Sequence, residues 1–350
     1  MQAAPSSVPP TAAPTSAGPG EPLSILEWSG YEATSYPEFF APFTAKYGDQ
    51  VADLLQYTFF ADDAEAYTKV RSGFHADVVH PCNSWWQLWV DAGLVQPIDT
   101  SRLSNWPGVN KQLAQMGQFD GQQYFIPWEW GFDSLLVRND LVPKQPTSWA
   151  DMWDPAYVGH IAQWDNAETG FVTAALAQGF DPWNTTSDQQ EQVKQKLIEL
   201  KSHLLTYWKD YTESYELPTT GDVWILTNAW QDAYANALDS GYDVSYINPT
   251  EGRLAWVCGY GITTDAGNVD LAYELLDASI APDSMAALGN TYWYGFSNMD
   301  AVPMVDDIVK QVMGLDNLGT LYDNTVFYRS LTEDQRQMMA DIWNQVKAAP

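Results

Sequence analysis

The sequence has few positive charges and no long apolar run. It contains 16 Lys and Arg residues against 45 Asp and Glu residues, which gives a formal net charge of −29 at pH 7. A negatively charged surface repels the phosphates of nucleic acids and anionic lipid headgroups, so we expect neither nucleic acids nor anionic membranes as partners. No run approaches the roughly 20 apolar residues that a membrane helix needs. The composition therefore predicts an acidic globular protein that does not cross a bilayer.

Motifs of catalysis and metal binding are also missing. The chain has no G-x-G-x-x-G after a strand, no phosphate loop, no G-x-S-x-G elbow and no H-E-x-x-H. Its four histidines, His75, His80, His160 and His203, are scattered without the spacing of metal ligands. Glycosidases use a pair of carboxylates, but with so many acids some pairs lie close together by chance, so such a pair is only weak evidence for an enzyme. We therefore expect no cofactor, no metal and no catalytic residues.

The chain has only two cysteines, Cys82 and Cys258. They match no metal-binding or C-x-x-C pattern. An even pair in an exported protein can form one disulfide, and two separate buried thiols are the alternative.

The first 22 residues have almost no charge and no hydrophobic periodicity. They are rich in Ala, Pro, Ser, Thr and Gly, and such a segment cannot offset the conformational entropy that ordering would cost. We expect residues 1–22 to form a flexible tether. We also expect Met1 to stand where an export signal has been removed, and a signal that ends in a lipid-bearing cysteine is one form of it.

Beyond the tether, short apolar runs alternate with helical patterns, as in a doubly wound α/β sheet. The first series has strands at 23–28, 51–59 and 76–79 and helices at 38–47 and 64–71. The second series has strands at 160–164, 223–226 and 244–247 and helices at 170–178 and 187–202. The sequence therefore predicts two α/β lobes.

Polar and aromatic residues follow several of these strands directly, at positions 29–31, 81–84, 165–168 and 230–232. In open α/β sheets, ligands bind outside the carboxyl ends of the strands. The chain also has 17 tryptophans, and aromatic faces attract cations through their quadrupole. Core packing is the alternative for any single tryptophan, and stacking on sugars keeps a carbohydrate-binding or carbohydrate-active extracellular protein as a second hypothesis.

Six segments together resemble landmarks of the spermidine/putrescine-binding proteins of bacterial ABC importers. They are Leu26 to Tyr31, Asp77 to Pro81, Ile126 to Trp128, Pro146 to Trp149, Asn248 to Gly252 and Leu275 to Pro282. The resemblance implies a type II periplasmic-binding-protein fold, in which a hinge of crossing strands joins two doubly wound α/β lobes around a ligand cleft. It places lobe one at residues 23–130 plus 257–302 and lobe two at 131–256 plus 303–350.

The resemblance also implies binding residues. Trp28, Ser29 and Tyr31 match the motif of the first strand, and Ser84 and Trp85 match the opposite wall of lobe one. Aromatic residues that enclose the methylene chain of a polyamine are matched by Trp230, Trp256 and Tyr294.

Several acids of the relatives are replaced in this chain. Gly30, Asn166, Thr169 and Cys258 stand where the relatives often have carboxylates, and four neighbouring acids are candidates to substitute for them: Glu129, Asp165, Glu168 and Asp232. A polycation buried without matching negative charge is penalised. We therefore expect a smaller ligand with one positive centre, such as an amino acid, an ω-amino acid or a quaternary amine, with a polyamine as the family's own alternative.

Two further expectations follow from the resemblance. Arg329 lies beside a late position from which the relatives send a polar side chain into the cleft, and its guanidinium suits a carboxylate on the ligand. A surface arginine, or an ion pair with an acid of the same lobe, is the equal alternative. The strand before Pro81 and the strand near Cys258 are expected to be antiparallel neighbours, which predicts a Cys82–Cys258 disulfide. As a whole, the resemblance implies a non-catalytic, monomeric binding protein in the periplasm or at the cell surface that delivers its ligand to an ABC permease.

Overall fold

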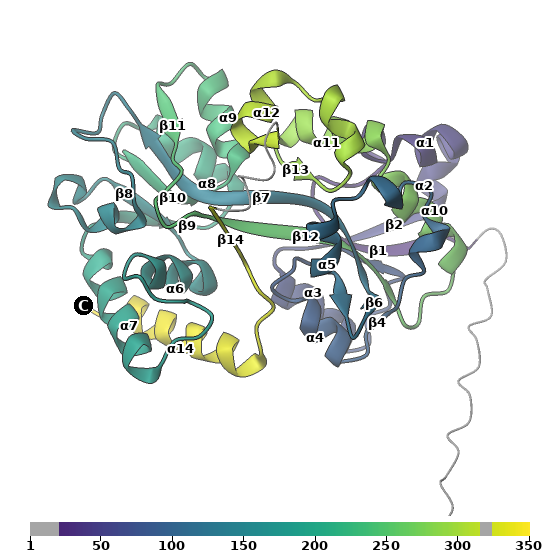
Figure 1. Cartoon of the computed structure of the whole chain (residues 1–350), viewed down its shortest axis with the longest axis horizontal. Coiled ribbons are helices and arrows are strands. Elements are labelled where there is room, and N and C mark those ends of the chain that lie inside the picture. The colour runs from purple at the N-terminus through teal and green to yellow at the C-terminus, as the bar shows by residue number, and fades with distance from the viewer. Residues whose placement is uncertain (1–20, 316–323) are drawn as a thin grey trace, which may run out of the picture.

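The computed structural model describes residues 21–315 and 324–350. These residues form two α/β lobes side by side, with the strands β7 and β12 running between them (Figure 1). Nearly all of the predicted tether, residues 1–22, lies outside the described residues. No helix in the described ranges has the length and apolar character to span a membrane.

Lobe one is built on a parallel sheet. Strand β1 (Leu23–Trp28) lies between β2 (Leu55–Phe60) and β3 (Val78–Val79) and is parallel to both. Helices α3 (Asp63–Arg71), α4 (Trp86–Asp91), α10 (Val269–Ser279) and α11 (Pro282–Tyr292) belong to this lobe. Because β1, β2 and β3 are parallel, their carboxyl ends meet at one edge of the sheet.

Lobe two repeats this plan. Strand β8 (Ile161–Trp164) lies between β9 (Leu204–Trp208) and β10 (Ile225–Ala229), again in parallel. The carboxyl end of β10 leads through Trp230 into α9 (Gln231–Asp239), and the carboxyl end of β8 leads into α6 (Ala167–Leu176). Helices α7 (Ser187–Lys201), α8 (Tyr211–Glu216) and α14 (Glu333–Ala348) complete the lobe.

Strands β7, β12 and β14 run between the two lobes. Strand β7 (Phe125–Arg138) pairs antiparallel with β12 (Arg253–Thr263) over much of its length, and every residue of β7 is buried. Strand β11 (Val244–Tyr246) extends the sheet of lobe two beside β7, and β14 (Thr325–Phe327) pairs in parallel with the start of β12. Strand β14 then leads the chain down to α14 (Figure 1). These crossing strands form the hinge that the resemblance implied.

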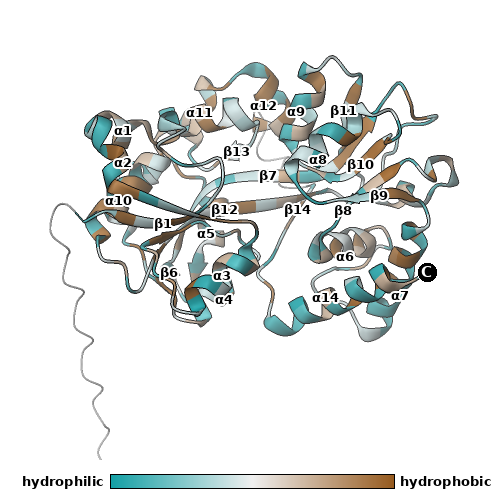
Figure 2. Ribbon diagram, turned by 180° about the vertical axis from the view of Figure 1, so that it is seen from behind, coloured by the Kyte–Doolittle hydropathy of each residue, from teal (hydrophilic) through white to brown (hydrophobic). Residues whose placement is uncertain are grey.

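Each lobe has its own apolar core. Hydrophobic residues concentrate on the central strands, and the outer helices α7 and α14 are largely hydrophilic on the surface (Figure 2). Residues 303–315, which we expected in lobe two, contribute Val305, Val309 and Met313 to the apolar cluster that fills lobe one. The detailed boundaries of the two lobes stay a prediction.

Most expected elements lie close to their predicted positions. One apolar run differs: residues 51–59, expected to be one strand, form a short helix, α2 (Val51–Leu54), before β2 begins at Leu55. Apolar periodicity alone does not distinguish a short buried helical turn from a strand.

Candidate ligand-binding site

A cavity of about 1440 Å³ lies between the lobes and is lined by both of them. The carboxyl ends of β1, β2, β3, β8 and β10 all contribute lining residues. Among the described residues, no group of three or more His, Cys, Asp or Glu side chains is placed to hold a metal ion. The cavity is instead rich in aromatic rings and carboxylates.

The carboxylate of Asp232 lies in a part of this cavity that is lined by aromatic residues. Asp232 lies in the first turn of α9, and its Oδ2 accepts a hydrogen bond of 2.8 Å from the Tyr215 hydroxyl. Burial raises the pKa of Asp232 to about 6, although hydrogen bonds, including those from Tyr215 and Tyr294, act to lower it. Tyr31 lines the same cavity, and burial, followed by the charges of neighbours that include Glu129 and Asp232, raises its pKa.

The aromatic walls of this pocket are packed against one another. The Trp256 and Tyr294 rings meet edge to face at 4.9 Å, and Trp230 meets Trp164 edge to face at 5.2 Å. Trp256 reaches its position over Gly131 of β7, where a Cβ atom would lie 2.3 Å from the indole. Only a glycine there allows the indole this approach, so the crossing strands position part of the pocket.

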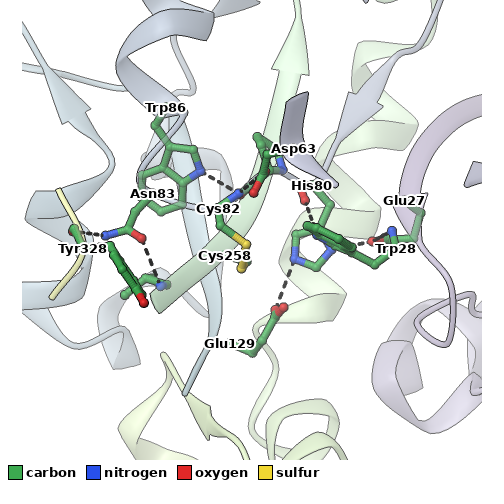
Figure 3. Close-up of a disulfide and its surroundings, with 12 residues drawn as sticks. Glu27, Trp28, Asp63, His80, Cys82, Asn83, Trp86, Glu129, Cys258 and Tyr328 are labelled. Carbon is green, nitrogen blue, oxygen red and sulfur yellow. Dashed lines mark hydrogen bonds and ion pairs between the residues drawn. A yellow bond between two sulfur atoms is a disulfide. The ribbon is translucent and has the colours of Figure 1, made fainter. Parts of the chain in front are cut away.

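A second carboxylate, Glu129, is fixed by a buried histidine. His80 Nε2 lies 3.2 Å from Glu129 Oε2, and His80 Nδ1 bonds to Glu27 (Figure 3). Tyr260 donates a hydrogen bond of 2.9 Å to the other oxygen of Glu27. Burial lowers the pKa of His80, but the charges of Glu129 and Glu27 outweigh it and raise this pKa to about 10. The imidazolium therefore partly neutralises two buried carboxylates, one of which lines the cavity.

A third group of charged side chains brings together residues from both lobes. The Arg336 guanidinium of α14 lies 3.8 Å above the ring of Trp85 in lobe one, and its Nη1 is 3.6 Å from Glu168 Oε2. Nη2 of Arg336 donates to the Ser84 carbonyl. Burial raises the pKa of Asp63 to about 7 and that of Glu168 to about 6, and the charge of Arg336 opposes both shifts.

Asp133 of β7 is a further acid at the cavity. Its Oδ2 accepts a hydrogen bond of 2.7 Å from Tyr328, whose hydroxyl is also 3.0 Å from that of Thr169. Burial raises the pKa of Asp133 to about 8, while Tyr328 and Trp230 lower it. This side chain is therefore mostly protonated at neutral pH.

The Cys82–Cys258 disulfide is confirmed and forms part of the cavity wall. The two residues are antiparallel bridge partners with Cα atoms 3.9 Å apart. Asn83 beside it donates to the Tyr328 carbonyl at 2.6 Å and accepts from the Val257 amide at 3.2 Å (Figure 3). These hydrogen bonds connect the loop after β3 to β12 and to the residue that follows β14.

The structure brings most of the predicted site residues together. Those that line the cavity are Trp28, Ser29, Tyr31, Ser84, Trp85, Glu129, Glu168, Thr169, Trp230, Asp232, Trp256 and Tyr294, together with both cysteines. Their contribution to binding stays a prediction. Arg329 is not among the lining residues: it is exposed, because the chain turns its neighbour Tyr328 inward to Asp133. Asp165 is absent from the lining as well, since its carboxylate pairs with Lys347 at 2.7 Å.

The sequence interpretation missed several charged residues of the cavity, among them Asp63, Asp133 and Arg336. Asp63 begins α3 shortly after the end of β2, so the strand-end rule that identified the other positions also applies to it. Asp133 is an acid within the apolar run of β7, which is itself a signal of a special environment. Arg336 lies on α14 and carries no local sequence signal.

Comparisons with known proteins agree with this architecture. Residues 76–311 match the model of the family described as bacterial extracellular solute-binding protein. The chain is 25% identical to the spermidine/putrescine-binding periplasmic protein of Escherichia coli over 283 residues, which cover 80% of this chain and 78% of that protein. It is 26% identical to the putrescine-binding periplasmic protein PotF of E. coli over 316 residues, covering 84% and 82%.

A solved structure shows the same fold. A putative spermidine/putrescine ABC transporter protein from Listeria monocytogenes superposes with a TM-score of 0.81 at 18% identity, covering 94% of this chain and all of the other. The two lobes, the crossing strands and the cavity between them are those of a type II periplasmic-binding protein. With a family match over 236 of its 350 residues (76–311), this chain belongs to the bacterial extracellular solute-binding proteins.

Proposed function

We propose that this chain captures a small amine-bearing ligand between its lobes and delivers it to the permease of an ABC importer. The observation that carries the proposal is the position of Asp232, an acid inside a pocket of aromatic rings. Among the described residues, no lysine, arginine or histidine forms an ion pair with it. An ammonium group bound there supplies the missing cation.

The physical argument combines burial with aromatic attraction. The Asp232 pKa of about 6 means that burial disfavours its charge, and a bound cation removes that penalty. Aromatic faces add about 0.5 to 2 kcal/mol for each cation contact. The Tyr215 and Tyr294 hydroxyls hydrogen-bond to this carboxylate, and Trp230 and Tyr31 line the same cavity. The charge on Glu129 reinforces the negative potential around Tyr31.

The remaining parts of the proposal concern the cellular role. The curated relatives are named for binding spermidine or putrescine, which supports an amine ligand. We propose that the chain is exported to the periplasm or the cell surface, with a lipid anchor as one form of attachment. There it acts as a monomer without catalysis and without nucleic acid partners. A carbohydrate ligand is less well supported, because stacking on sugars does not require a buried acid within the aromatic pocket.

A thermal-shift screen tests the proposal. Polyamines, amino acids, ω-amino acids, betaines and oligosaccharides are added to the full chain. A ligand present at 100 times its dissociation constant stabilises the folded state by about 2.7 kcal/mol. We expect stabilisation by at least one amine, and its loss in the variant Asp232→Asn. Stabilisation by oligosaccharides alone contradicts the proposal.

A further inference from the structure

Arg336 occupies a place in the cavity that has the chemistry of a cation-binding subsite. Its guanidinium stacks on Trp85 at 3.8 Å and lies 3.6 Å from the carboxylate of Glu168. Asp63 adds a further attractive charge, and the Ser84 carbonyl accepts a hydrogen bond from Nη2. An aromatic face, a carboxylate and a carbonyl acceptor are the groups that would bind a ligand ammonium.

The guanidinium and its acid do not saturate one another. Nε of Arg336 and Oε1 of Glu168 are both buried and have no hydrogen-bond partner. A structural ion pair of arginine with a carboxylate is commonly bidentate, with two parallel hydrogen bonds, whereas this contact is a single one at 3.6 Å. The arrangement therefore differs from a rigid structural ion pair.

The Asp232 pocket has the same ingredients without a cation. Its carboxylate accepts hydrogen bonds from Tyr215, Tyr294 and the Ala233 amide, so in the described residues it bonds only to uncharged donors, and Trp230 lines the same cavity. The cavity thus contains two acidic, aromatic regions, one at α9 and one at the junction of α6 and α14. They differ in that the second already contains a positive charge from the chain itself.

We infer that Arg336 is a resident cation that fills one of two cation subsites, so that the ligand brings a single cationic centre, to the Asp232 pocket. This inference rests on the proposed function and adds a determinant of specificity to it. In a ligand with two ammonium groups, the second group would have to displace the guanidinium from Trp85 and Glu168. The chain is therefore selective against diamines and polyamines and accepts monoamines of similar length.

The test uses matched ligands on one carbon scaffold. Isothermal titration calorimetry measures the binding of 1-aminobutane, 1,4-diaminobutane and 4-aminobutanoate, with 1,6-diaminohexane and spermidine as longer polycations. The variants are Arg336→Gln, which removes the charge, and Arg336→Met, which also keeps an apolar stem against Trp85 if the first fails to fold. Arg329→Gln is the matched control, because it removes the same charge seven positions away, outside the cavity.

We expect Arg336→Gln or Arg336→Met to bind at least one of the polycations about 10-fold tighter than the unmodified chain, and 1-aminobutane with an affinity changed by less than about threefold. Adding Glu168→Gln is expected to abolish that gain, because the vacated subsite then lacks its carboxylate. Arg329→Gln is expected to change neither the affinity for the polycations nor the affinity for 1-aminobutane.

The other outcomes overturn the inference in distinguishable ways. If amines bind but no polycation gains affinity in either Arg336 variant, Arg336 does not occupy a cation subsite, and the proposed function stands. If 4-aminobutanoate binds well and loses more than about 10-fold in the variants, Arg336 binds the carboxylate of a zwitterion instead. If no amine binds the unmodified chain or the variants, the proposed function fails together with the inference.

Discussion

The affinity for an amine is expected to decrease when the pH falls below 6, because binding requires Asp232 in its ionised form. Burial raises the pKa of this carboxyl from its ordinary value to about 6. With that pKa the ionised fraction is about 0.9 at pH 7 and about 0.09 at pH 5. An alkylammonium ligand keeps its charge throughout this range. The association constant should therefore fall about 10-fold from pH 7 to pH 5, which corresponds to about 1.4 kcal/mol.

The free energy of unfolding does not fall with pH as the affinity does, as far as these carboxyls determine it. Asp232, Glu168 and Asp133 all have raised pKa values, so the folded chain holds their protons more tightly than the unfolded chain. Their contribution to the free energy of unfolding consequently grows as the pH falls from about 8 towards 4. Weaker binding at pH 5 is therefore separable from a loss of stability by these groups.

Calorimetric titrations at pH 5, 6, 7 and 8, at constant ionic strength and with the best-binding amine, measure the effect. Asp232→Asn is expected to bind weakly at every pH and to lack the part of the slope that Asp232 causes. Any slope that remains reports on other carboxyls of the cavity, such as Glu168 and Asp63, whose pKa values are about 6 and about 7. Equal affinity of the unmodified chain at pH 5 and pH 7, or an undiminished slope in Asp232→Asn, would refute the reasoning.

Three further predictions concern the walls and the support of the site. Trp230→Ala and Trp256→Ala should each weaken amine binding by more than about 10-fold without unfolding the chain, and the ligand should change tryptophan fluorescence; unchanged affinity in both variants counts against this pocket. The disulfide closes a loop with a sequence separation of 176 residues, so replacing Cys82 and Cys258 by serine should lower the free energy of unfolding in urea by up to about 5 kcal/mol. Two thiols alkylated in the unreduced, denatured chain would contradict the bridge. His80→Gln leaves two buried carboxylates without their cation and should cost about 3–5 kcal/mol, and in the unmodified chain the stability supplied by His80 should be lost as the pH rises from 6.5 to about 10. A flat urea midpoint across that range would contradict this role.

The fold was largely predictable because its signals are local. Alternating apolar and amphipathic segments identified most of the strands and helices, and the resemblance supplied the order in which they cross between the lobes. The run at 51–59 was predicted as one strand because the four-residue helix α2 continues directly into β2, and apolar residues alone do not mark the boundary between them. Strand-end positions such as Asp232 and Ser84 were found because the carboxyl ends of parallel strands converge on the cavity.

The charge balance of the site was less predictable, because it depends on contacts between distant segments. Arg329 and Arg336 are seven positions apart, and only the path from β14 into α14 decides which one reaches Trp85. Asp165 and Glu168 follow the same strand, yet Lys347 from the end of the chain holds the first carboxylate away from the cavity. No local pattern encodes either outcome.

The disulfide restricts where the lobes can pivot. Because Cys82 fastens β12 to lobe one at Cys258, any bending of that strand has to occur before this residue, within the segment that begins at Arg253. Trp256 lies in that short segment, so we expect its ring to lie near the axis of any opening motion and to move less than residues farther from the hinge. The same bond also encloses residues 83–257 in a covalent ring, so a single proteolytic cut within this stretch leaves the two pieces covalently joined.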